Sequence, residues 1–140
     1  MVEEGLRNHL SKALAPHYRV VKQGRQLKGS KMTLTPDLLF LPTGATGDVK
    51  YQLSQGVWSR SHIYQGVTFA TEFRTPHGLV ISFSSASSAP LADVKVGDVT
   101  LHSVTWRAIN HSSPDDSAQD VVDQVRGWLQ SIELPVAAAS

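Results

Sequence analysis

The stretch from residue 31 to residue 52 decides the fold, and it reads Lys31-Met-Thr-Leu-Thr-Pro-Asp-Leu-Leu-Phe-Leu41, then Pro-Thr-Gly-Ala-Thr-Gly, then Asp48-Val-Lys-Tyr-Gln52. Two apolar runs of strand-forming residues flank a loop of Pro, Gly and Thr, which is the pattern of a β-hairpin with a longer turn. Side chains alternate between faces along a strand, so Asp48 and Lys50 point to one side and Val49 to the other. Pairing of the two strands brings Asp37 beside Asp48.

The predicted hairpin therefore gathers two carboxylates and a lysine on one patch. Two carboxylates held close together repel, and the pKa of one of them rises unless a cation neutralises the pair. A hard divalent cation is the natural occupant, because such ions prefer oxygen ligands. Asp37 and Asp48 are accordingly candidate metal ligands.

This arrangement resembles the PD-(D/E)xK nuclease superfamily. Asp48-Val-Lys-Tyr51 is similar to the Asp-x-Lys-Tyr strand of McrC-like nucleases, which are the nuclease subunits of McrBC restriction systems for modified DNA. The later segment Ile63-Tyr-Gln-Gly-Val-Thr-Phe-Ala70 resembles the Tyr-Gln-x-x-x-Tyr-Ala helix of McrC-like and RecB-like nucleases, with Phe69 where a tyrosine is usual. The resemblance covers roughly residues 2 to 110 and rests on the order of motifs along the chain.

The resemblance implies an α/β, restriction-endonuclease-like fold with a central mixed β-sheet flanked by α-helices. A chain of 140 residues with 41% apolar content is most simply a single domain over residues 1–140. Periodicity and turn residues predict the elements. They are helices over 2–15, 59–73 and 114–132, strands over 17–22 and 78–83, a hairpin of 93–96 with 99–109, and a frayed tail over 135–140. The helix over 114–132 either completes the core or docks a partner through Trp128.

The activity that the resemblance implies is Mg²⁺-dependent hydrolysis of DNA phosphodiester bonds, with Mn²⁺ as a substitute ion. Asp37 and Asp48 would bind the ion together with the backbone carbonyl of Val49. Lys50 would orient a water and stabilise the charge that develops on the phosphate. Gln65, from the helix that follows, would contact the scissile strand or position a water.

Members of this superfamily usually supply a further acid from the first helix, where Glu3 and Glu4 are the candidates. On a helical wheel Glu3 lies near the Leu6 and Leu10 face, whereas Glu4 points away from the core. An acid at the buried edge of a helix needs a partner, which a metal would provide, so we choose Glu3. The alternative is that both acids serve the helix dipole.

Charge is unevenly distributed although the net charge is only +1. From Gly5 to Pro36 the chain has no acid, but it carries Arg7, Lys12, Arg19, Lys22, Arg25, Lys28 and Lys31. We expect the cluster of Arg19, Lys22, Arg25, Lys28 and Lys31 to bind nucleic acid, with a solvated basic face as the alternative. The low net charge implies help from a partner, such as an NTPase motor or a DNA-recognition domain or subunit.

Several classes of protein are excluded. The absence of cysteine excludes disulfides, thiolate zinc sites and cysteine-ligated iron–sulfur clusters. The apolar run Leu38–Leu41 is far too short to span a membrane, and the N-terminus lacks a secretory signal, so a cytoplasmic location and no membrane partner are expected. The histidines lack zinc-ligand spacing, and we expect His62 to be exposed to solvent.

The expected function is therefore a DNA endonuclease of a restriction or phage-defence system. Two alternatives stay open. One is a nuclease-fold module that binds nucleic acid or a protein partner without cutting, which loss of a motif acid would indicate. The other is a Holliday-junction resolvase-type nuclease, which shares the Glu…Pro-Asp…(Glu/Asp)-x-Lys pattern. A homodimer is compatible with each of them.

Overall fold

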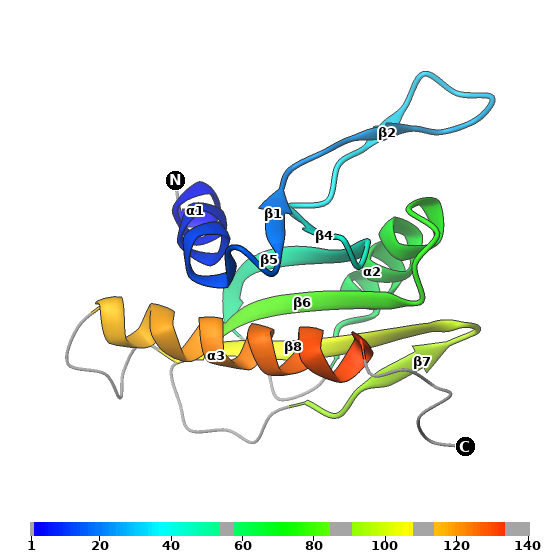
Figure 1. Ribbon diagram of the computed structural model, residues 1–140. Coiled ribbons are helices and arrows are strands. Elements are labelled where there is room, and N and C mark those ends of the chain that lie inside the picture. Colours follow the sequence, from blue (N-terminus) through cyan, green and yellow to red (C-terminus); the bar gives the residue numbers. More distant parts are fainter. Residues whose placement is uncertain (1, 54–57, 85–90, 108–113, 134–140) are drawn as a thin grey trace, which may run out of the picture.

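A computed structural model of the chain describes residues 2–53, 58–84, 91–107 and 114–133 (Figure 1). The elements are α1 (Val2–Leu14), β1 (Arg19–Val21), β2 (Arg25–Gln26), β3 (Thr33–Leu34), β4 (Leu38–Leu41), β5 (Ala45–Leu53), α2 (Arg60–Glu72), β6 (His77–Ser84), β7 (Val94–Val96), β8 (Val99–Arg107) and α3 (Pro114–Glu133). The three predicted helices are confirmed to within a few residues. The tail predicted over 135–140 lies outside the described residues.

The central sheet is mixed and six-stranded, in the order β1-β4-β5-β6-β8-β7. Antiparallel pairing joins β1 to β4, β4 to β5 and β7 to β8, whereas β5, β6 and β8 run parallel. Helix α2 makes the crossover from β5 to β6, as parallel strands require. The prediction of an α/β fold with a mixed sheet flanked by helices is confirmed.

Helices α1 and α3 cover one face of the sheet, and α2 covers the other (Figure 1). The leucines of α1 and the valines of α3 pack there against alternate residues of β4, β5, β6 and β8, Val49 among them. Trp128 of α3 is 7% exposed and meets the Phe40 ring edge-on, with the ring centroids 5.8 Å apart. Trp128 therefore belongs to the core of the domain, which leaves the α2 face to carry Asp48 and Lys50.

Two glycines allow α2 to lie close to the sheet. A Cβ atom built on Gly78 would lie 2.7 Å from Leu101 Cδ2, and one on Gly66 would lie 2.9 Å from the same atom. Real Cβ contacts are longer than this, so a side chain at either position would push the helix or Leu101 away. This close approach sets the distance of α2 from β6 and β8.

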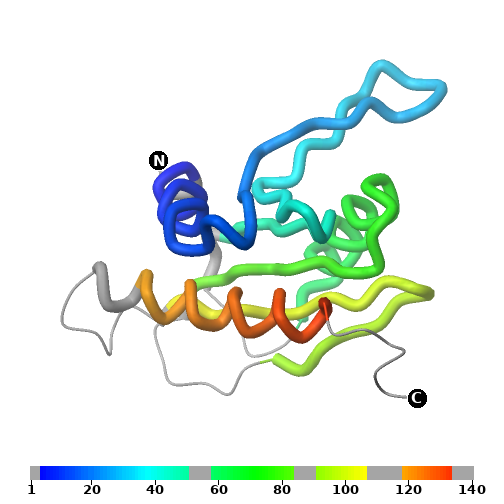
Figure 2. The backbone as a smooth tube through the Cα atoms, viewed as in Figure 1, coloured from blue at the N-terminus to red at the C-terminus, as the bar shows by residue number. Residues whose placement is uncertain are grey.

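A small second sheet corrects the sequence interpretation of residues 31–41. Thr33–Leu34 pairs with Arg25–Gln26, and only Leu38–Leu41 pairs with β5. The break falls at Pro36, which has no amide hydrogen for a ladder and restricts the residue before it. The β2–β3 hairpin projects from the main sheet (Figure 2). The turn before β5 is also shorter than predicted, because β5 begins at Ala45.

None of the helices in the described ranges has both the length and the apolar content that a membrane crossing requires.

Candidate active site

Strand register places Asp37 opposite Asp48. Leu38, the first residue of β4, pairs with Gly47 of β5 in an antiparallel ladder. Asp37, which precedes Leu38, therefore faces Asp48, which follows Gly47. Asp37 Oδ2 accepts a hydrogen bond of 2.8 Å from the backbone N–H of Val49. One oxygen of the Asp37 carboxylate is thereby fixed against the middle of β5.

Asp48 is buried, with 6% of its surface exposed, and a lysine lies beside it. Lys50 Nζ is 2.5 Å from Asp48 Oδ2. Within the described residues that oxygen has no partner in hydrogen-bond geometry, so the contact is an attraction of charges without an aligned hydrogen bond. A buried carboxylate oxygen that lacks an aligned donor is suited to a cation, because an unsatisfied buried charge is costly.

Helix α2 brings Gln65 to the same place. The helix begins after Ser59, whose backbone is extended and whose side chain makes no capping hydrogen bond. Lys50 Nζ donates a hydrogen bond to Gln65 Oε1. The structure thus brings the predicted residues Asp37, Asp48, Lys50 and Gln65 together on the α2 face of the sheet.

The structure says less about the other two predicted metal ligands, Val49 and Glu3. Val49 turns its side chain into the core and leaves only its backbone for the site. The side chain of Glu3 lies outside those that the structure describes, whereas Glu4 is exposed. Among the described side chains, no group of three or more His, Asp or Glu residues gathers to hold a metal. The described residues could offer an ion two carboxylates and a carbonyl, which are hard oxygens of the kind that Mg²⁺ takes while keeping several waters.

His62 lies next to the site. The sequence analysis expected its side chain to be exposed to solvent, and that prediction was wrong. It is half-buried on α2, three residues before Gln65. Burial lowers the pKa of His62, and the positive charge of Lys50 lowers it further. The i, i+3 spacing to Gln65 was the available signal, because residues so spaced share a helix face.

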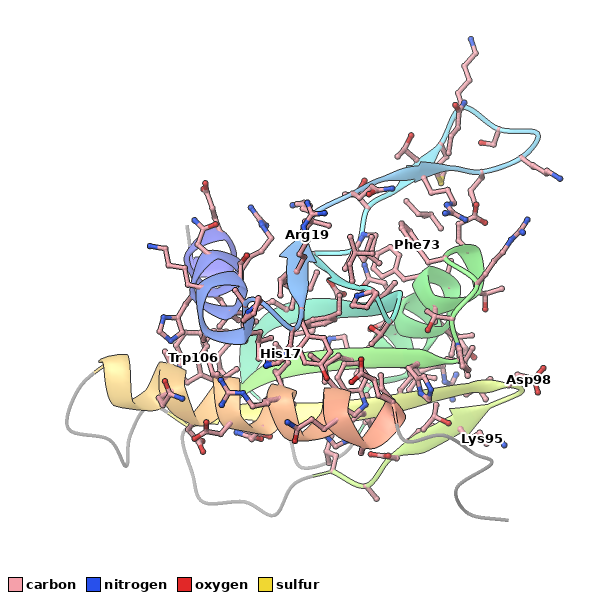
Figure 3. All side chains as sticks on the ribbon, in the orientation of Figure 1. His17, Arg19, Phe73, Lys95, Asp98 and Trp106 are labelled. Atoms are coloured by element: carbon pink, nitrogen blue, oxygen red, sulfur yellow. The ribbon has the colours of Figure 1, made fainter. Side chains whose placement is uncertain are left out.

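The predicted nucleic-acid-binding residues fall into two groups. Arg19 is exposed on edge strand β1 (Figure 3), and Lys22 follows directly after that strand. Arg25, Lys28 and Lys31 lie in the β2–β3 hairpin. The Arg25 guanidinium lies 5.0 Å from the centre of the Phe73 ring and donates a hydrogen bond of 3.2 Å to the carbonyl of Glu72. Arg25 therefore fastens the hairpin to the C-terminal end of α2.

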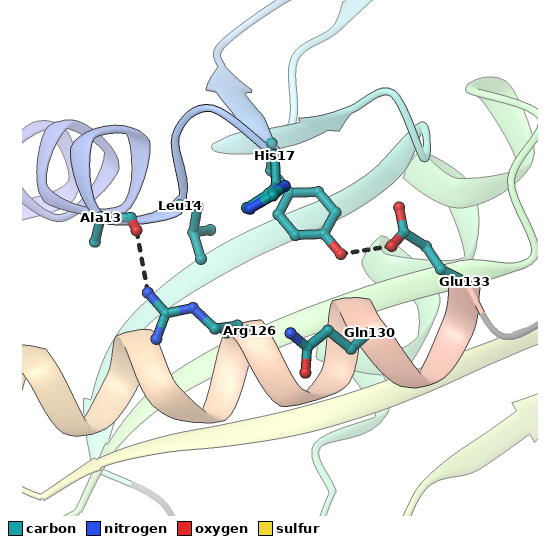
Figure 4. A pocket seen from close by; sticks show the side chains of 7 residues that line it. Ala13, Leu14, His17, Arg126, Gln130 and Glu133 are labelled. Atoms are coloured by element: carbon teal, nitrogen blue, oxygen red, sulfur yellow. Dashed lines mark hydrogen bonds between the residues drawn. The ribbon is translucent and has the colours of Figure 1, made fainter.

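A cavity of about 410 Å³ lies elsewhere, between α1 and α3 (Figure 4). It is lined by Ala13, Leu14, His17, Tyr18, Arg126, Gln130 and Glu133. The Tyr18 hydroxyl donates a hydrogen bond of 2.6 Å to Glu133 Oε2, and Arg126 Nη2 donates one of 3.0 Å to the carbonyl of Ala13. Burial and the Glu133 carboxylate raise the pKa of Tyr18 to about 12. Arg126 thus joins α3 to α1, and Tyr18 joins α3 to the segment between α1 and β1, on the face opposite the candidate active site.

Comparison with known proteins gives a result at the level of the fold alone. No model of a protein family matches the sequence, and no curated protein matches it. A solved structure does match: a half-complex from the tetradecameric assembly of Thermococcus gammatolerans McrB AAA+ hexamers with bound McrC. The TM-score is 0.68 at 11% sequence identity, and the match covers 86% of this chain and 31% of the matched chain.

The chain shares its fold with part of that assembly. Because the sequence identity is 11%, the likeness extends to the arrangement of helices and strands and to nothing finer. The chain spans about a third of the length of the protein that it matches.

Proposed function

We propose that this chain is a metal-dependent nuclease domain that hydrolyses DNA phosphodiester bonds within a restriction or phage-defence system. The observation that carries the proposal is the meeting of two carboxylates, a lysine and a glutamine on one face of the sheet, supplied by the residue before β4, by β5 and by α2. The fold of the McrB–McrC assembly supports that setting and also a partnership with an AAA+ motor.

In the proposed reaction, Asp37, Asp48 and the Val49 carbonyl would hold Mg²⁺, for which Mn²⁺ could substitute. When bound, such an ion supplies a water of lowered pKa and neutralises charge on the phosphate. Asp37 keeps the peptide of Val49 in place through its hydrogen bond to the N–H. Each of these roles uses an oxygen that the hairpin has already positioned.

Lys50 and Gln65 would act on the phosphate side of the site. Lys50 presents a fixed positive charge beside Asp48, which stabilises negative charge that develops on phosphate oxygens. Gln65 holds the ammonium group of Lys50 through its side-chain oxygen. Because the lysine is already oriented, little reorganisation is needed when the substrate binds.

A panel of DNA substrates tests this function. Single-stranded, duplex and branched DNA are incubated with Mg²⁺ or Mn²⁺, with EDTA and the Asp48→Asn variant as controls. The matched control is Asp98→Asn, which changes an exposed aspartate in the turn between β7 and β8. We expect metal-dependent cutting by the wild type and by Asp98→Asn, and none by Asp48→Asn. A preference for branched DNA would favour the resolvase alternative.

One observation favours a non-catalytic module as a second candidate. The ammonium of Lys50 already lies against the Asp48 carboxylate, so the site carries a positive partner of its own without an ion. Thermal unfolding separates the two candidates. A nuclease site gains stability when Mg²⁺ binds the folded state, and the melting temperature rises with ion concentration. An unchanged melting temperature together with no cutting would support the binding module.

A further inference from the structure

We propose that the β2–β3 hairpin, residues 24–34 and called the arm below, is a ribbon that enters a groove of duplex DNA and holds the duplex beside the candidate active site. The proposal deepens the proposed function by naming the surface that grips the substrate. The binding of the arm to DNA is nevertheless a separate claim, since it does not require a metal.

The arm is an ordered two-stranded ribbon that stands away from the main sheet (Figures 1 and 2). Arg25 pairs with Leu34 and Gln26 with Thr33, and Leu27 N–H donates to the Met32 carbonyl at 2.9 Å. Gly29, with φ of 76°, allows the chain to reverse at the tip. The tip is thereby held in a defined shape.

The dimensions of such a ribbon suit the major groove. Two paired strands lie about 4.8 Å apart, and the groove is about 12 Å wide, so it admits a two-stranded ribbon with its side chains. The three residue steps from Gly24 to Leu27, before the turn begins, span roughly 10 Å at about 3.3 Å per residue. This exceeds the groove depth of about 8.5 Å, so the tip can reach base edges while the base of the arm stays on the protein.

The chemistry of the arm favours a duplex over a single strand. Residues 24–34 carry Arg25, Lys28 and Lys31 and contain neither an acid nor an aromatic residue. Lys28 and Lys31 flank the tip and are exposed, as phosphate contacts require. Proteins that bind single strands rely on aromatic side chains that stack on the bases, which this arm lacks.

Further side chains of the arm suit the interior of a groove. Gln26, Ser30 and Thr33 are exposed. Gln26 Nε2 donates to the Ser30 carbonyl and Ser30 Oγ accepts from the Met32 N–H, which leaves the Gln26 amide oxygen and the hydroxyl hydrogens of Ser30 and Thr33 to bond base edges. Met32 is 61% exposed, and a groove would remove it from water.

The position of the arm ties it to the candidate active site. Its second strand ends at Leu34, and the chain continues through Thr35 and Pro36 to Asp37. Its first strand is fastened to the end of α2 by Arg25. Both attachments belong to elements that supply candidate catalytic groups. By contrast, α3 on the other face of the sheet carries Asp120, Asp123 and Glu133, which would repel DNA.

The test compares two double variants of the full chain in EDTA. Lys28→Gln/Lys31→Gln removes the tip cations, and Lys12→Gln/Lys95→Gln removes two exposed lysines of α1 and β7. Fluorescence anisotropy measures Kd for a labelled duplex and for one of its single strands over a series of salt concentrations. EDTA removes divalent ions, so the result does not depend on a metal at the candidate active site.

We expect the wild type to prefer the duplex and the arm variant to bind it at least about ten-fold more weakly. The slope of log K against log salt should fall by about 1.8 in the arm variant, since each phosphate contact contributes about 0.9. The control variant should bind within about two-fold of the wild type. Exposed substitutions leave folding intact, which the melting temperature checks.

Three results would overturn the proposal: equal loss of binding in both variants, no loss in the arm variant, or a preference for the single strand. A wild type that binds no duplex in EDTA would overturn it as well. In each case, a rise in melting temperature with Mg²⁺ would still support a metal site at the candidate active site. DNA binding by the arm can therefore be refuted without refuting the proposed nuclease.

Discussion

Lys50 is the residue on which the candidate site depends most. Its ammonium group meets Asp48 Oδ2 on its own strand and Gln65 Oε1 on α2, and its charge reaches His62. Its side chain is only 16% exposed, so these contacts are partly shielded from water. A lysine held in this way acts as a fixed charge, whereas an exposed lysine is mobile and screened.

Lys50→Gln should therefore separate chemistry from metal binding. We expect the cleavage rate to fall by about 10²–10³-fold, which is the usual cost of removing a group that stabilises charge in the transition state. The rise in melting temperature with Mg²⁺ should persist, because both carboxylates remain. The matched control is Lys95→Gln on β7. If Lys50→Gln cut DNA at the wild-type rate, Lys50 would have no part in the chemistry.

At the scale of elements, the contact of α2 with β6 and β8 decides whether Gln65 reaches Lys50. Leu101 is fully buried beneath the helix, and its side chain fills the space that Gly66 and Gly78 leave open. Protein interiors are close-packed, so an added methyl group must displace something. The two glycines are thus part of the machinery that positions the site.

Gly78→Ala should lower the free energy of unfolding by about 1–3 kcal/mol, the usual cost of overpacking a core. Urea denaturation measures this, and metal-dependent cleavage should weaken in the same variant as α2 shifts. Gly127→Ala is the control, since a Cβ there meets nothing within 4 Å. It should raise stability by up to about 1 kcal/mol through helix propensity. If Gly78→Ala were as stable as the wild type, the Leu101 side chain would have moved aside, and Gly78 would have no part in holding α2 close to the sheet.

The link between Arg25 and α2 is a second feature at this scale. Arg25→Gln removes the contact with the Phe73 ring and weakens the hold on the Glu72 carbonyl. We expect trypsin to cleave after Lys28 and Lys31 several-fold faster, because proteolysis follows local opening. Arg19→Gln, at an exposed position on β1, is the control. Equal cleavage rates in wild type and Arg25→Gln would mean that the arm is ordered without this contact.

At the scale of the whole molecule, hydrogen bonds join the N-terminal part of the chain to α3 over one face of the sheet. The hydrogen bond from Tyr18 to Glu133 spans 115 residues of sequence, and the one from Arg126 to the Ala13 carbonyl spans 113. Such contacts form only when both ends of the chain have docked. They make the stability of the α1–α3 face a property of the complete domain.

Tyr18→Phe should lower the free energy of unfolding by about 1 kcal/mol at neutral pH through loss of this hydrogen bond. The pKa of Tyr18 rises from 10.0 to about 12 on folding, so the folded state favours the neutral phenol. That contribution is complete below pH 10 and is lost as the pH rises toward 12. Urea denaturation at intervals over this range should show a steeper fall for wild type than for Tyr18→Phe. If the free energy of unfolding fell equally with pH in wild type and Tyr18→Phe, the raised pKa of Tyr18 would be contradicted.

Turn residues and the alternation of side chains predicted those parts of the fold whose shape depends on residues close together in the sequence. The Pro-Thr-Gly turn and the alternation of Asp48, Val49 and Lys50 were sufficient for the hairpin, whereas its register required the position of the turn, because β5 begins at Ala45 and not at Asp48. The helix that carries Trp128 was predicted as well. Whether Trp128 packs in the core or docks a partner could be decided only from its contact with Phe40. Sequence periodicity finds long elements and says little about how they dock.

The missed features depend on tertiary contacts. The arm escaped prediction because each of its strands has two residues and no apolar alternation, so its shape rests on turn hydrogen bonds and on Arg25. His62 was placed in solvent because only the docking of α2 buries it. The roles of Asp37, Asp48, Lys50 and Gln65 stay predictions from the motif, now with a geometry that allows them.

The most direct test of the central claim is the rate at which a supercoiled plasmid is nicked in Mg²⁺, measured side by side for wild type, Asp48→Asn and Asp98→Asn. We expect nicking by wild type and Asp98→Asn that EDTA abolishes, and none by Asp48→Asn. Equal nicking by Asp48→Asn and wild type would show that Asp48 has no part in cleavage. A wild type that neither nicks DNA nor gains thermal stability from Mg²⁺ or Mn²⁺ would contradict the proposed function.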